Sequence, residues 1–277
     1  MIAALDIGGT KLSAASVQGG RVLRRDQRPT PEDRRPQSLV GAAVGLLEPF
    51  LSGAKALGVA ATGTVRGGKV TAPNQQTLPW TNVDLQGMLQ QATHLPTFVL
   101  NDADAACWGE ARFGVGRGVA NFLFVTVSTG IGSGLVLGGR LHEGSELGFT
   151  RVSGRGFLEH LASGKALDEW AEKRGWDGAA AVVKRAESDA EAAAVLEESA
   201  RLLADKLLDL QRMLGLERVA VGGSLGLSEG YIRRLIHAVG PELAVVSASL
   251  GADAGLIGAA DWANRQLDAQ MADTNVG

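Results

Sequence analysis

The sequence predicts an α/β protein of two domains, and three features of the chain lead to this prediction. Short apolar strands alternate with amphipathic helices. The 277 residues are enough for two domains of ordinary size. A strand, a glycine turn and a returning strand occur within residues 2–17, and the same arrangement recurs within 121–137. The recurrence indicates two related halves, each with a glycine-rich loop suited to phosphate.

The domain boundary is expected in the glycine-rich stretch that follows Phe113. We expect an N-terminal domain of residues 1–113 plus 252–266 and a C-terminal domain of residues 114–251. Residues 267–277 are expected to form a frayed tail.

The first half of the chain alternates between apolar runs and helical spacing. After the opening hairpin, the elements that we expect are, in order, a strand at 21–24, a helix at 37–50, a strand at 56–61, an irregular connection over 69–80, a short helix at 84–92, a strand at 97–100 and a helix at 105–113.

The second half continues in the same way. We expect strands at 121–127 and 134–137, a charged loop at 140–164, helices at 166–174 and 191–214, a strand at 218–221, a helix at 229–239, a strand at 243–247 and a helix at 252–266. The longest helix, 191–214, has leucine and alanine at a period near 3.5, which indicates a core-facing stripe; a dimer seam is the alternative.

Composition excludes several classes of protein. The net charge of −3 and the lack of a basic run argue against a nucleic-acid partner. The single cysteine, Cys107, excludes a disulfide framework. Residues 118–139 carry no charge and are long enough to cross a bilayer, but their glycines and hydroxyls suit two buried strands better. We therefore expect a cytoplasmic protein with no membrane partner and no signal peptide.

The first glycine turn combines features that suit a nucleotide phosphate. Gly8 and Gly9 can adopt positive φ and bring bare backbone close to a ligand. Thr10 and Lys11 add a hydroxyl and a cation, and Asp6 adds a carboxylate suited to the Mg²⁺ that accompanies phosphate. The alternative is a plain hairpin with solvated turn residues. The recurrence of the turn later in the chain favours the phosphate site.

Asp102 is the candidate for acid–base chemistry. Asn101 and Asp102 follow a strand and begin a helix, so their side chains lie at the edge of an α/β sheet where ligands bind. Asp102 is then either a general base for an attacking hydroxyl or a simple helix cap. The two phosphate loops favour the base, because phosphoryl transfer needs an acceptor for the hydroxyl proton.

Three further positions have two interpretations each. Gly222-Gly223-Ser224 either lets a flat purine lie against backbone or marks a close contact between a helix and a strand. Glu146 and Glu159 either bind sugar hydroxyls or are ordinary surface charges.

Taken in order, these motifs resemble those of ROK-family sugar kinases (repressor, open reading frame, kinase) of the actin-like ATPase superfamily. The matching segments are Asp6 to Lys11, Asn101 to Ala106, Ser128 to Gly134 and Val221 to Ser224. Pro73-Asn74 with Trp80 resembles a sugar-side loop of the family. The resemblance covers nearly the whole chain and implies an actin-like (ribonuclease H-like) fold of two domains with a cleft between them.

The resemblance also implies roles for individual residues. Asp102 would be the base that acts on a hexose 6-hydroxyl. The residues that would hold the sugar are Gly63, Asn74, Asn101, Asp102, Glu146 and Glu159. The residues that would surround the nucleotide are Asp6, Gly8, Gly9, Thr10, Lys11, Thr129, Gly130, Gly132, Gly222 and Gly223. ATP and Mg²⁺ would be the cofactors, with Asp6 near the metal.

The chain departs from the family at its zinc knuckle. Phe149 stands where the family has a histidine, and Phe157 stands at the last cysteine position. A structural zinc needs four nitrogen or sulfur ligands, which this chain does not supply, so we predict no zinc.

The sequence thus predicts ATP-dependent phosphorylation of a hexose or N-acetylhexosamine at the 6-hydroxyl, of the glucokinase or N-acetylmannosamine kinase type. A catalytically silent sugar-binding or sugar-sensing relative is the alternative. Regulatory relatives carry a DNA-binding helix-turn-helix ahead of the first motif, and we expect none here. The preferred sugar, and ATP or polyphosphate as donor, stay open. We expect a homodimer, with a tetramer as the other possibility.

Overall fold

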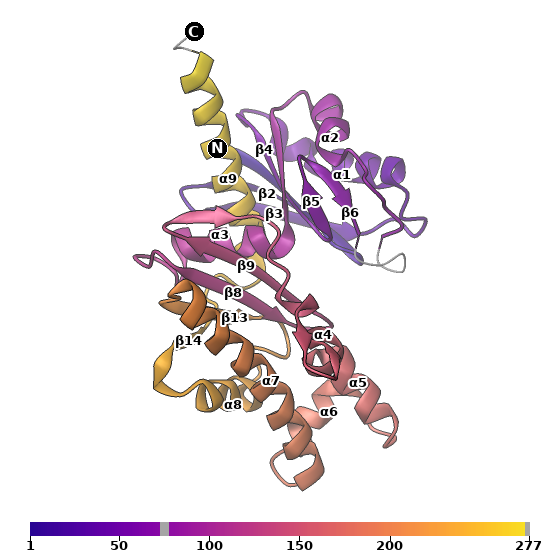
Figure 1. Cartoon of the computed structure of the whole chain (residues 1–277). Helices are drawn as coiled ribbons and strands as arrows, with labels where there is room; N and C mark the ends of the chain where they lie inside the picture. The colour runs from indigo at the N-terminus through magenta and orange to yellow at the C-terminus, as the bar shows by residue number, and fades with distance from the viewer. Residues whose placement is uncertain (73–77, 275–277) are drawn as a thin grey trace. The chain divides into compact units, whose positions relative to one another are not determined.

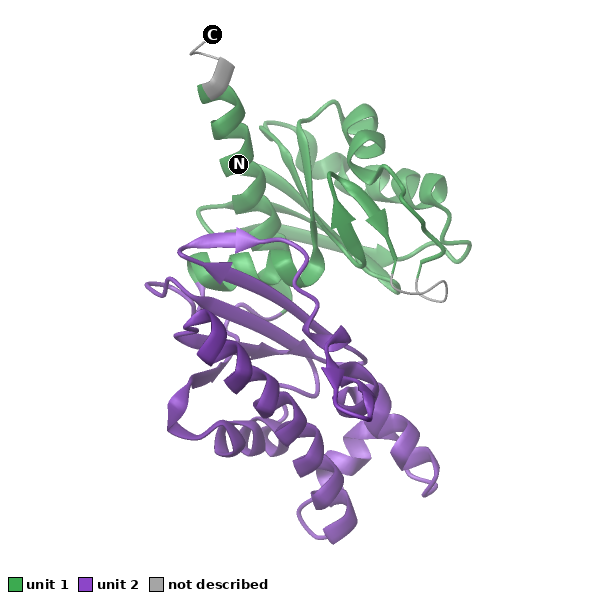
Figure 2. Ribbon diagram, in the orientation of Figure 1, with its two compact units in different colours: residues 1–113, 252–277 green, residues 114–251 purple. Residues whose placement is uncertain are grey.

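The computed structural model describes residues 1–72 and 78–274. Within it the chain divides into two compact units, Met1–Phe113 with Ala252–Gly277, and Gly114–Gly251 (Figure 2). The end of the chain therefore returns to the first unit, where it packs on the strands that begin the chain.

Unit 1 is built on a five-stranded sheet in the order β3-β2-β1-β4-β7 (Figure 1). Its strands are β1 (Ile2–Ile7), β2 (Lys11–Gln18), β3 (Arg21–Pro29), β4 (Leu57–Ala61) and β7 (Thr97–Asn101). The first three form an antiparallel meander, while β4 and β7 run parallel to β1. The parallel strands end together, because Ile7 pairs with Ala61 and Ala61 pairs with Asn101.

Helices cover both faces of this sheet. Leu57 and Val59 of β4 belong to the apolar core that also contains α1 (Pro36–Leu51) and α2 (Leu85–Thr93). Gly58 lies between them and faces the other side, as the period of a strand requires. There a Cβ on Gly58 would lie 2.1 Å from the carbonyl oxygen of Ala259 in α9 (Ala254–Thr274), so glycine allows the helix to approach the sheet. α3 (Asp102–Phe113) packs beside α9.

Two expectations for unit 1 are wrong in detail. Helix α9 does not end at Gln266 but continues to Thr274, through most of the stretch expected to be a frayed tail. Residues 64–71, taken in part as irregular, form a small antiparallel pair, β5 (Thr64–Arg66) and β6 (Lys69–Thr71). Gly67 and Gly68 join these strands with φ of 55° and 75°, a two-residue turn with a twist that matches a hairpin.

Unit 2 repeats the topology of unit 1. Its five-stranded sheet has the order β10-β9-β8-β13-β14, again an antiparallel meander followed by two strands parallel to the first. The strands are β8 (Phe122–Val127), β9 (Ile131–Leu137), β10 (Arg140–His142), β13 (Arg218–Gly222) and β14 (Ala244–Ser247). The recurrence of the strand, glycine turn and strand is thus a recurrence of the whole sheet.

The remaining elements of unit 2 are mostly helical. They are the 3₁₀ turn η1 (Leu147–Phe149), the short strands β11 (Arg151–Val152) and β12 (Gly156–Phe157), the helices α4 (Leu158–Ala162), α5 (Gly164–Glu172), α6 (Gly178–Arg185), α7 (Ala190–Leu214) and α8 (Glu229–Val239), and the 3₁₀ turns η2 (Gly240–Glu242) and η3 (Gly251–Asp253). Helix α6 has no counterpart among the expected elements, because its eight residues are too few to show a clear period.

Helix α7 has the core role expected from its leucine stripe. Leu196, Leu203 and Leu207 are fully buried in the core of unit 2. Asp189 begins the helix, since its Oδ1 accepts hydrogen bonds from the backbone of Glu191 and Ala192. Toward the end of the helix the stripe becomes only partly buried.

Across the described residues, no helix combines the length and the hydropathy that crossing a bilayer requires. The uncharged stretch 118–139 is instead β8 and β9 with their flanking turns, as the sequence predicts.

Candidate functional site

The carboxyl ends of the parallel strands in unit 1 gather the first set of polar groups. β1, β4 and β7 end in register, and the chain continues from them into Gly8, Thr62 and Asp102. Ligands of open α/β sheets bind at this edge. The topology therefore brings the first glycine turn and the candidate base to one edge of one sheet.

The first glycine turn is narrow because its two strands approach closely, and not because its glycines adopt positive φ. Neither Gly8 nor Gly9 is among the described residues with positive φ, so the turn does not use the left-handed backbone that glycine can adopt. Instead the N–H of Gly8 donates to the carbonyl of Lys11 at 3.0 Å, and a Cβ on Gly8 would lie 3.2 Å from that same oxygen. Glycine is needed here for close approach across the hairpin. Thr10 and Lys11 are exposed at its tip.

Thr30, at the residue after β3, fixes this turn from the side. Its hydroxyl donates to the carbonyl of Gly8 at 2.7 Å, and its N–H donates to the carbonyl of Thr10 at 3.0 Å. Two hydrogen bonds from one buried residue hold the tip, so the loop is shaped before any ligand binds.

Asn101, rather than Asp102, satisfies the start of helix α3. Its Oδ1 accepts the N–H groups of Ala103 (2.9 Å) and Asp104 (3.1 Å). Its Nδ2 donates to the carbonyl of Gly63 at 2.9 Å, and Gly63 has a φ of 117°. Asn101 thus joins the β4–β5 connection to the helix, and the cap interpretation of Asp102 loses most of its support.

Asp102 is partly buried and held at both carboxylate oxygens. Oδ2 accepts the hydroxyl of Thr62 at 3.0 Å, and Oδ1 accepts the N–H of Ala103 at 2.8 Å. Burial raises the pKa of Asp102, while the hydrogen bonds from Thr62 and Ala103 lower it. The resulting carboxylate has a fixed orientation and an increased affinity for a proton, as a general base requires.

Asp6 lies close enough to Asp102 for the two charges to interact. Burial, and then repulsion from the Asp102 carboxylate, raise the pKa of Asp6 from 3.8 to about 7, and Lys11 offsets this only in part. Lys11 therefore does not neutralise the negative charge of the two carboxylates near neutral pH. A cation at Asp6 would relieve the repulsion, so the donor chemistry fits Mg²⁺.

The second glycine turn, in unit 2, joins β8 to β9. The N–H of Ser128 donates to the carbonyl of Gly130 at 2.9 Å, which closes the turn. Thr129 is exposed, while its carbonyl accepts the N–H of Lys165 at 3.1 Å and so ties the turn to α5. Gly132 already lies within β9, paired with Thr126, and is not part of the turn.

Glu159 is bound to this second turn. Its Oε2 accepts the N–H of Ile131 at 2.9 Å, and a Cβ on Gly130 would lie 2.4 Å from the same oxygen. A larger residue at 130 would displace the carboxylate. Glu159 therefore shapes the loop expected to hold phosphate, a contact that its sequence context does not reveal. Glu146 lies just before η1, between Ser145 and Leu147, whose backbone groups both bond the hydroxyl of Ser133.

A pocket of about 380 Å³ in unit 2 links the second glycine turn to a third glycine motif, Gly222-Gly223-Ser224. It lies within the roughly 300–1,000 Å³ range of small-molecule sites. The residues that line it are Ser128, Thr129, Gly164, Asp168, Ala179, Ala180, Val183, Ser224, Leu225 and Ser228. The hydroxyls of Ser128 and Ser224 lie 3.2 Å apart, so the two motifs meet directly.

Gly223 is required by the backbone beside this pocket. It has a φ of 83°, and a Cβ there would lie 2.3 Å from the carbonyl oxygen of Val127. That oxygen accepts the N–H groups of Leu225 and Gly226. On Gly222 a Cβ would lie 2.9 Å from the ring of Phe124.

A model of the ROK family matches residues 2–266. The chain belongs to the ROK family. Its fold is the actin-like ATPase fold that ROK kinases share.

Several of its relatives have named activities. The bifunctional enzyme NanE/NanK of Brucella melitensis biotype 1 is 38% identical over 278 residues, which cover 95% of this chain and 54% of that protein. The chain thus spans about half the length of that relative.

Other relatives match from end to end. The N-acetylmannosamine kinase of Citrobacter koseri is 36% identical over 280 residues, which cover 93% of this chain and 96% of that enzyme. A ROK family glucokinase from Streptomyces griseus, solved with glucose and AMPPNP, is 29% identical with a TM-score of 0.80 over 95% of this chain and 99% of that one. The similarity to these enzymes indicates a phosphotransferase of the sugar-kinase class.

This ROK protein does not fit the zinc knuckle of its family. Phe149 and Phe157 contact each other edge to face, with ring centroids 6.0 Å apart, and His160 lies 5.7 Å from the Phe157 ring. Cys107, the single cysteine, is buried in α3 of unit 1. Among the described residues no group of three or more histidine, cysteine or acidic side chains could hold a metal. Aromatic packing occupies the place of two ligands, and the absence of zinc stays a prediction.

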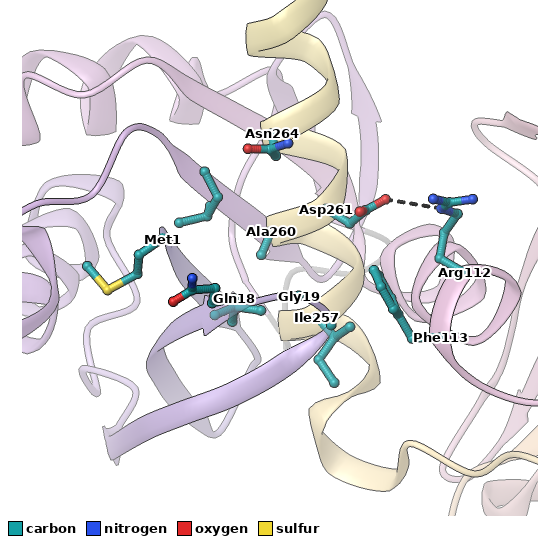
Figure 3. Close-up of a pocket in the computed structure, with 12 residues that line it drawn as sticks. Met1, Gln18, Gly19, Arg112, Phe113, Ile257, Ala260, Asp261 and Asn264 are labelled. Carbon is teal, nitrogen blue, oxygen red and sulfur yellow. Dashed lines mark ion pairs between the residues drawn. The ribbon is translucent and has the colours of Figure 1, made fainter.

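A second pocket of about 300 Å³ lies in unit 1, away from the candidate site (Figure 3). It is lined by the start of β1 and the end of β2, which pair with each other, by the end of α3 and by α9. Arg112 and Asp261 form an ion pair at its wall, with Nε and Oδ2 3.4 Å apart. β1 begins here and carries Asp6 to its opposite end, roughly 13 Å away at the rise of a strand.

Two groups of residues escape the sequence analysis. Thr62 contacts Asp102, and a signal for it exists, since it directly follows a parallel strand just as Asp102 does. Asp168 and the start of α6 line the unit 2 pocket, and no local pattern singles them out. Asn74, expected to hold the sugar, lies outside the described residues.

Proposed function

We propose that the protein phosphorylates a hexose or N-acetylhexosamine at its 6-hydroxyl, with ATP as donor and Asp102 as general base. The observation that carries this proposal is the setting of Asp102. It lies at the carboxyl edge of a parallel sheet, beside the first glycine turn, with both oxygens held and its proton affinity raised by burial. The identity of about 36% to an N-acetylmannosamine kinase over nearly the whole chain supports the substrate class.

In this proposal unit 1 supplies the base. As the sugar oxygen attacks the γ-phosphorus, its proton passes to Asp102, the new O–P bond forms and the bond to the departing ADP breaks. Asp6 would hold Mg²⁺, which when bound offsets the negative charge of the phosphates.

Unit 2 supplies the nucleotide site. The pocket between the second and third glycine motifs would take the adenosine, since its hydroxyls suit a ribose and its apolar side suits a base. Thr129 and Gly130 would meet the phosphates, with Glu159 holding their loop in shape. Glu146 and Gly63 are retained as sugar-site residues, and Thr10 and Lys11 as phosphate-site residues, in this proposal. A homodimer and a cytoplasmic location are also proposed; light scattering of the purified chain tests the former.

The experiment is an ADP-release assay of the purified chain with MgATP across glucose, mannose, N-acetylglucosamine and N-acetylmannosamine. Asp102→Asn should lower turnover by about 10²–10⁴-fold. The amide keeps the shape of the site, because the Thr62 hydroxyl can rotate to accept from it. Asp84→Asn is the matched control, since Asp84 caps α2 in the same unit and asparagine caps equally well.

The outcomes are distinct. A 6-deoxy sugar that is bound but not phosphorylated would support the 6-hydroxyl as acceptor. Turnover with polyphosphate in place of ATP would change the donor but not the base. Silence across the panel, with sugar binding retained in calorimetry, would favour a sugar-binding protein without catalysis and overturn the proposal.

A further inference from the structure

Thr62 occupies a position that neither the sequence motifs nor the proposed reaction assigns. It is the first residue after β4, and its hydroxyl donates to Oδ2 of Asp102 at 3.0 Å. Its backbone N–H donates to the carbonyl of Ile7 at 3.0 Å, which ties it to the end of β1. The residue thus bridges the strand that carries Asp6 and the helix that begins with Asp102.

The sheet fixes where this hydroxyl lies. Ala61, just before Thr62, pairs with Asn101, just before Asp102, in the parallel register of β4 and β7. Threonine is branched at Cβ, so its χ1 angle has few choices. The position of the donor relative to the carboxylate is therefore set by strand pairing and not by a flexible loop.

The Asp102 carboxylate accepts hydrogen bonds at both of its oxygens. A carboxylate offers about four acceptor positions. One on Oδ2 is taken by Thr62 and one on Oδ1 by the N–H of Ala103, and hydrogen bonds from the Asn101 side chain and from the backbone of Asp102 also lower its pKa. A carboxylate held at both oxygens cannot turn freely, so its orientation is fixed.

The charged groups around Asp102 make the hydrogen bond from the Thr62 hydroxyl more important for the pKa of Asp102. Asp6 on β1 repels the Asp102 carboxylate, and Lys11 on β2 acts mainly on Asp6. Helix α9 presents Gly255 beside them, where a Cβ would lie 3.9 Å from Oδ2 of Asp6. Burial raises the pKa of Asp102, and the hydrogen bond from Thr62 is the foremost of the contacts that lower it.

We propose that Thr62 is a positioning residue, the hydroxyl of which holds the Asp102 carboxylate in one orientation and in its ionised form, ready to accept the proton of the sugar hydroxyl. The inference rests on the proposed role of Asp102 as base. It goes further than that role, because it makes Thr62 responsible for the ionisation and the orientation of the base. Thr62 itself does not contact the substrate in this proposal.

The test compares four substitutions in the purified chain. Thr62→Val keeps the shape and removes the donor, with Thr62→Ala as a second form if valine disturbs folding. Thr62→Ser restores the hydroxyl. Thr97→Val is the matched control, because Thr97 also loses one hydrogen bond, to the carbonyl of Leu95, but at the opposite end of β7.

Two readouts are measured for each. The first is a ¹³C NMR titration of the Asp102 side-chain carboxyl, assigned by its absence in Asp102→Asn. The second is the dependence of kcat and KM on pH. We expect the Thr62→Val carboxyl to titrate at higher pH than in the wild type, kcat on the acid side to fall about tenfold, and KM to change little. Thr62→Ser should return both readouts to the wild-type values, and Thr97→Val should leave both unchanged.

A Thr62→Val carboxyl that titrates like the wild type would overturn the inference, as would a serine variant that behaves like the valine variant. Failure of the proposed function looks different. If the wild type turns over none of the sugars, the kinase proposal fails, while the carboxyl titration still decides the role of Thr62.

Discussion

Asp6→Asn measures what the burial of the Asp6 carboxylate, and its repulsion by Asp102, cost the folded protein. In the folded protein Asp6 keeps its proton up to about pH 7, whereas an unfolded aspartate loses it near 3.8. Between these values the folded state binds more protons than the unfolded state, so the free energy of unfolding falls as the pH rises. Below about pH 4 the effect is absent, and above about pH 7 it is complete. Asparagine carries no charge at any pH and removes this loss.

The size of the effect follows from the two pKa values. A pKa raised from 3.8 to about 7 corresponds to at most about 4 kcal/mol. Asp6 is only partly buried, so solvent screening reduces the expected gain to about 1–3 kcal/mol above pH 7. Asp6→Asn should therefore be more stable than the wild type at pH 8 and should lose that advantage toward pH 4.

Urea unfolding at pH 4, 5, 6, 7 and 8, followed by circular dichroism with EDTA present, measures the difference. Asp209→Asn is the control, because Asp209 is exposed on α7 in the other unit and its substitution leaves Asp6 and Asp102 unchanged. A difference between Asp6→Asn and the wild type that is constant from pH 4 to pH 8 would refute the assignment of a raised pKa, and with it the reasoning that a cation belongs beside Asp6.

Three further substitutions test the frame of the site. Gly223→Ala should lower ATP affinity in calorimetry and destabilise the fold by about 1–3 kcal/mol, whereas Gly251→Ala, with positive φ but open space, should lose under about 1 kcal/mol and bind ATP normally. Phe157→Ala should destabilise unit 2 by about 1–2 kcal/mol in urea unfolding, while a zinc chelator leaves the wild-type midpoint unchanged; a chelator-sensitive midpoint would contradict aromatic packing in place of zinc. Gly58→Ala should push α9 from its sheet and lower Tm sharply, and an unchanged Tm would contradict that close approach.

The sequence predicts where the candidate site residues lie in the fold when the strands and helices around them are clear from apolar spacing. Asp102 and Asn101 lie where a strand passes into a helix, a feature readable from apolar spacing alone. The two glycine turns are visible because each lies between two apolar strands, and their likeness correctly indicates two related sheets. The sequence does not predict the local backbone conformation of the glycine turn. A glycine in a turn can provide positive φ or close approach. Gly8 provides close approach to the Lys11 carbonyl across the hairpin, and no sequence pattern distinguishes these two uses of glycine.

The amino-acid sequence by itself determined which residues are candidates for the chemistry of this protein, because a carboxylate after a strand and a glycine turn between strands are local features. Only the tertiary structure decided how those groups are set. The proton affinity of Asp6 depends on burial and on Asp102, which lies far along the chain, and Glu159 is tied to Ile131 by a fold that no spacing records. Strand register placed Thr62 against Asp102. The pKa values and the orientations of these side chains depend on contacts between segments that are distant in the sequence. Such contacts form only when the sheet is assembled.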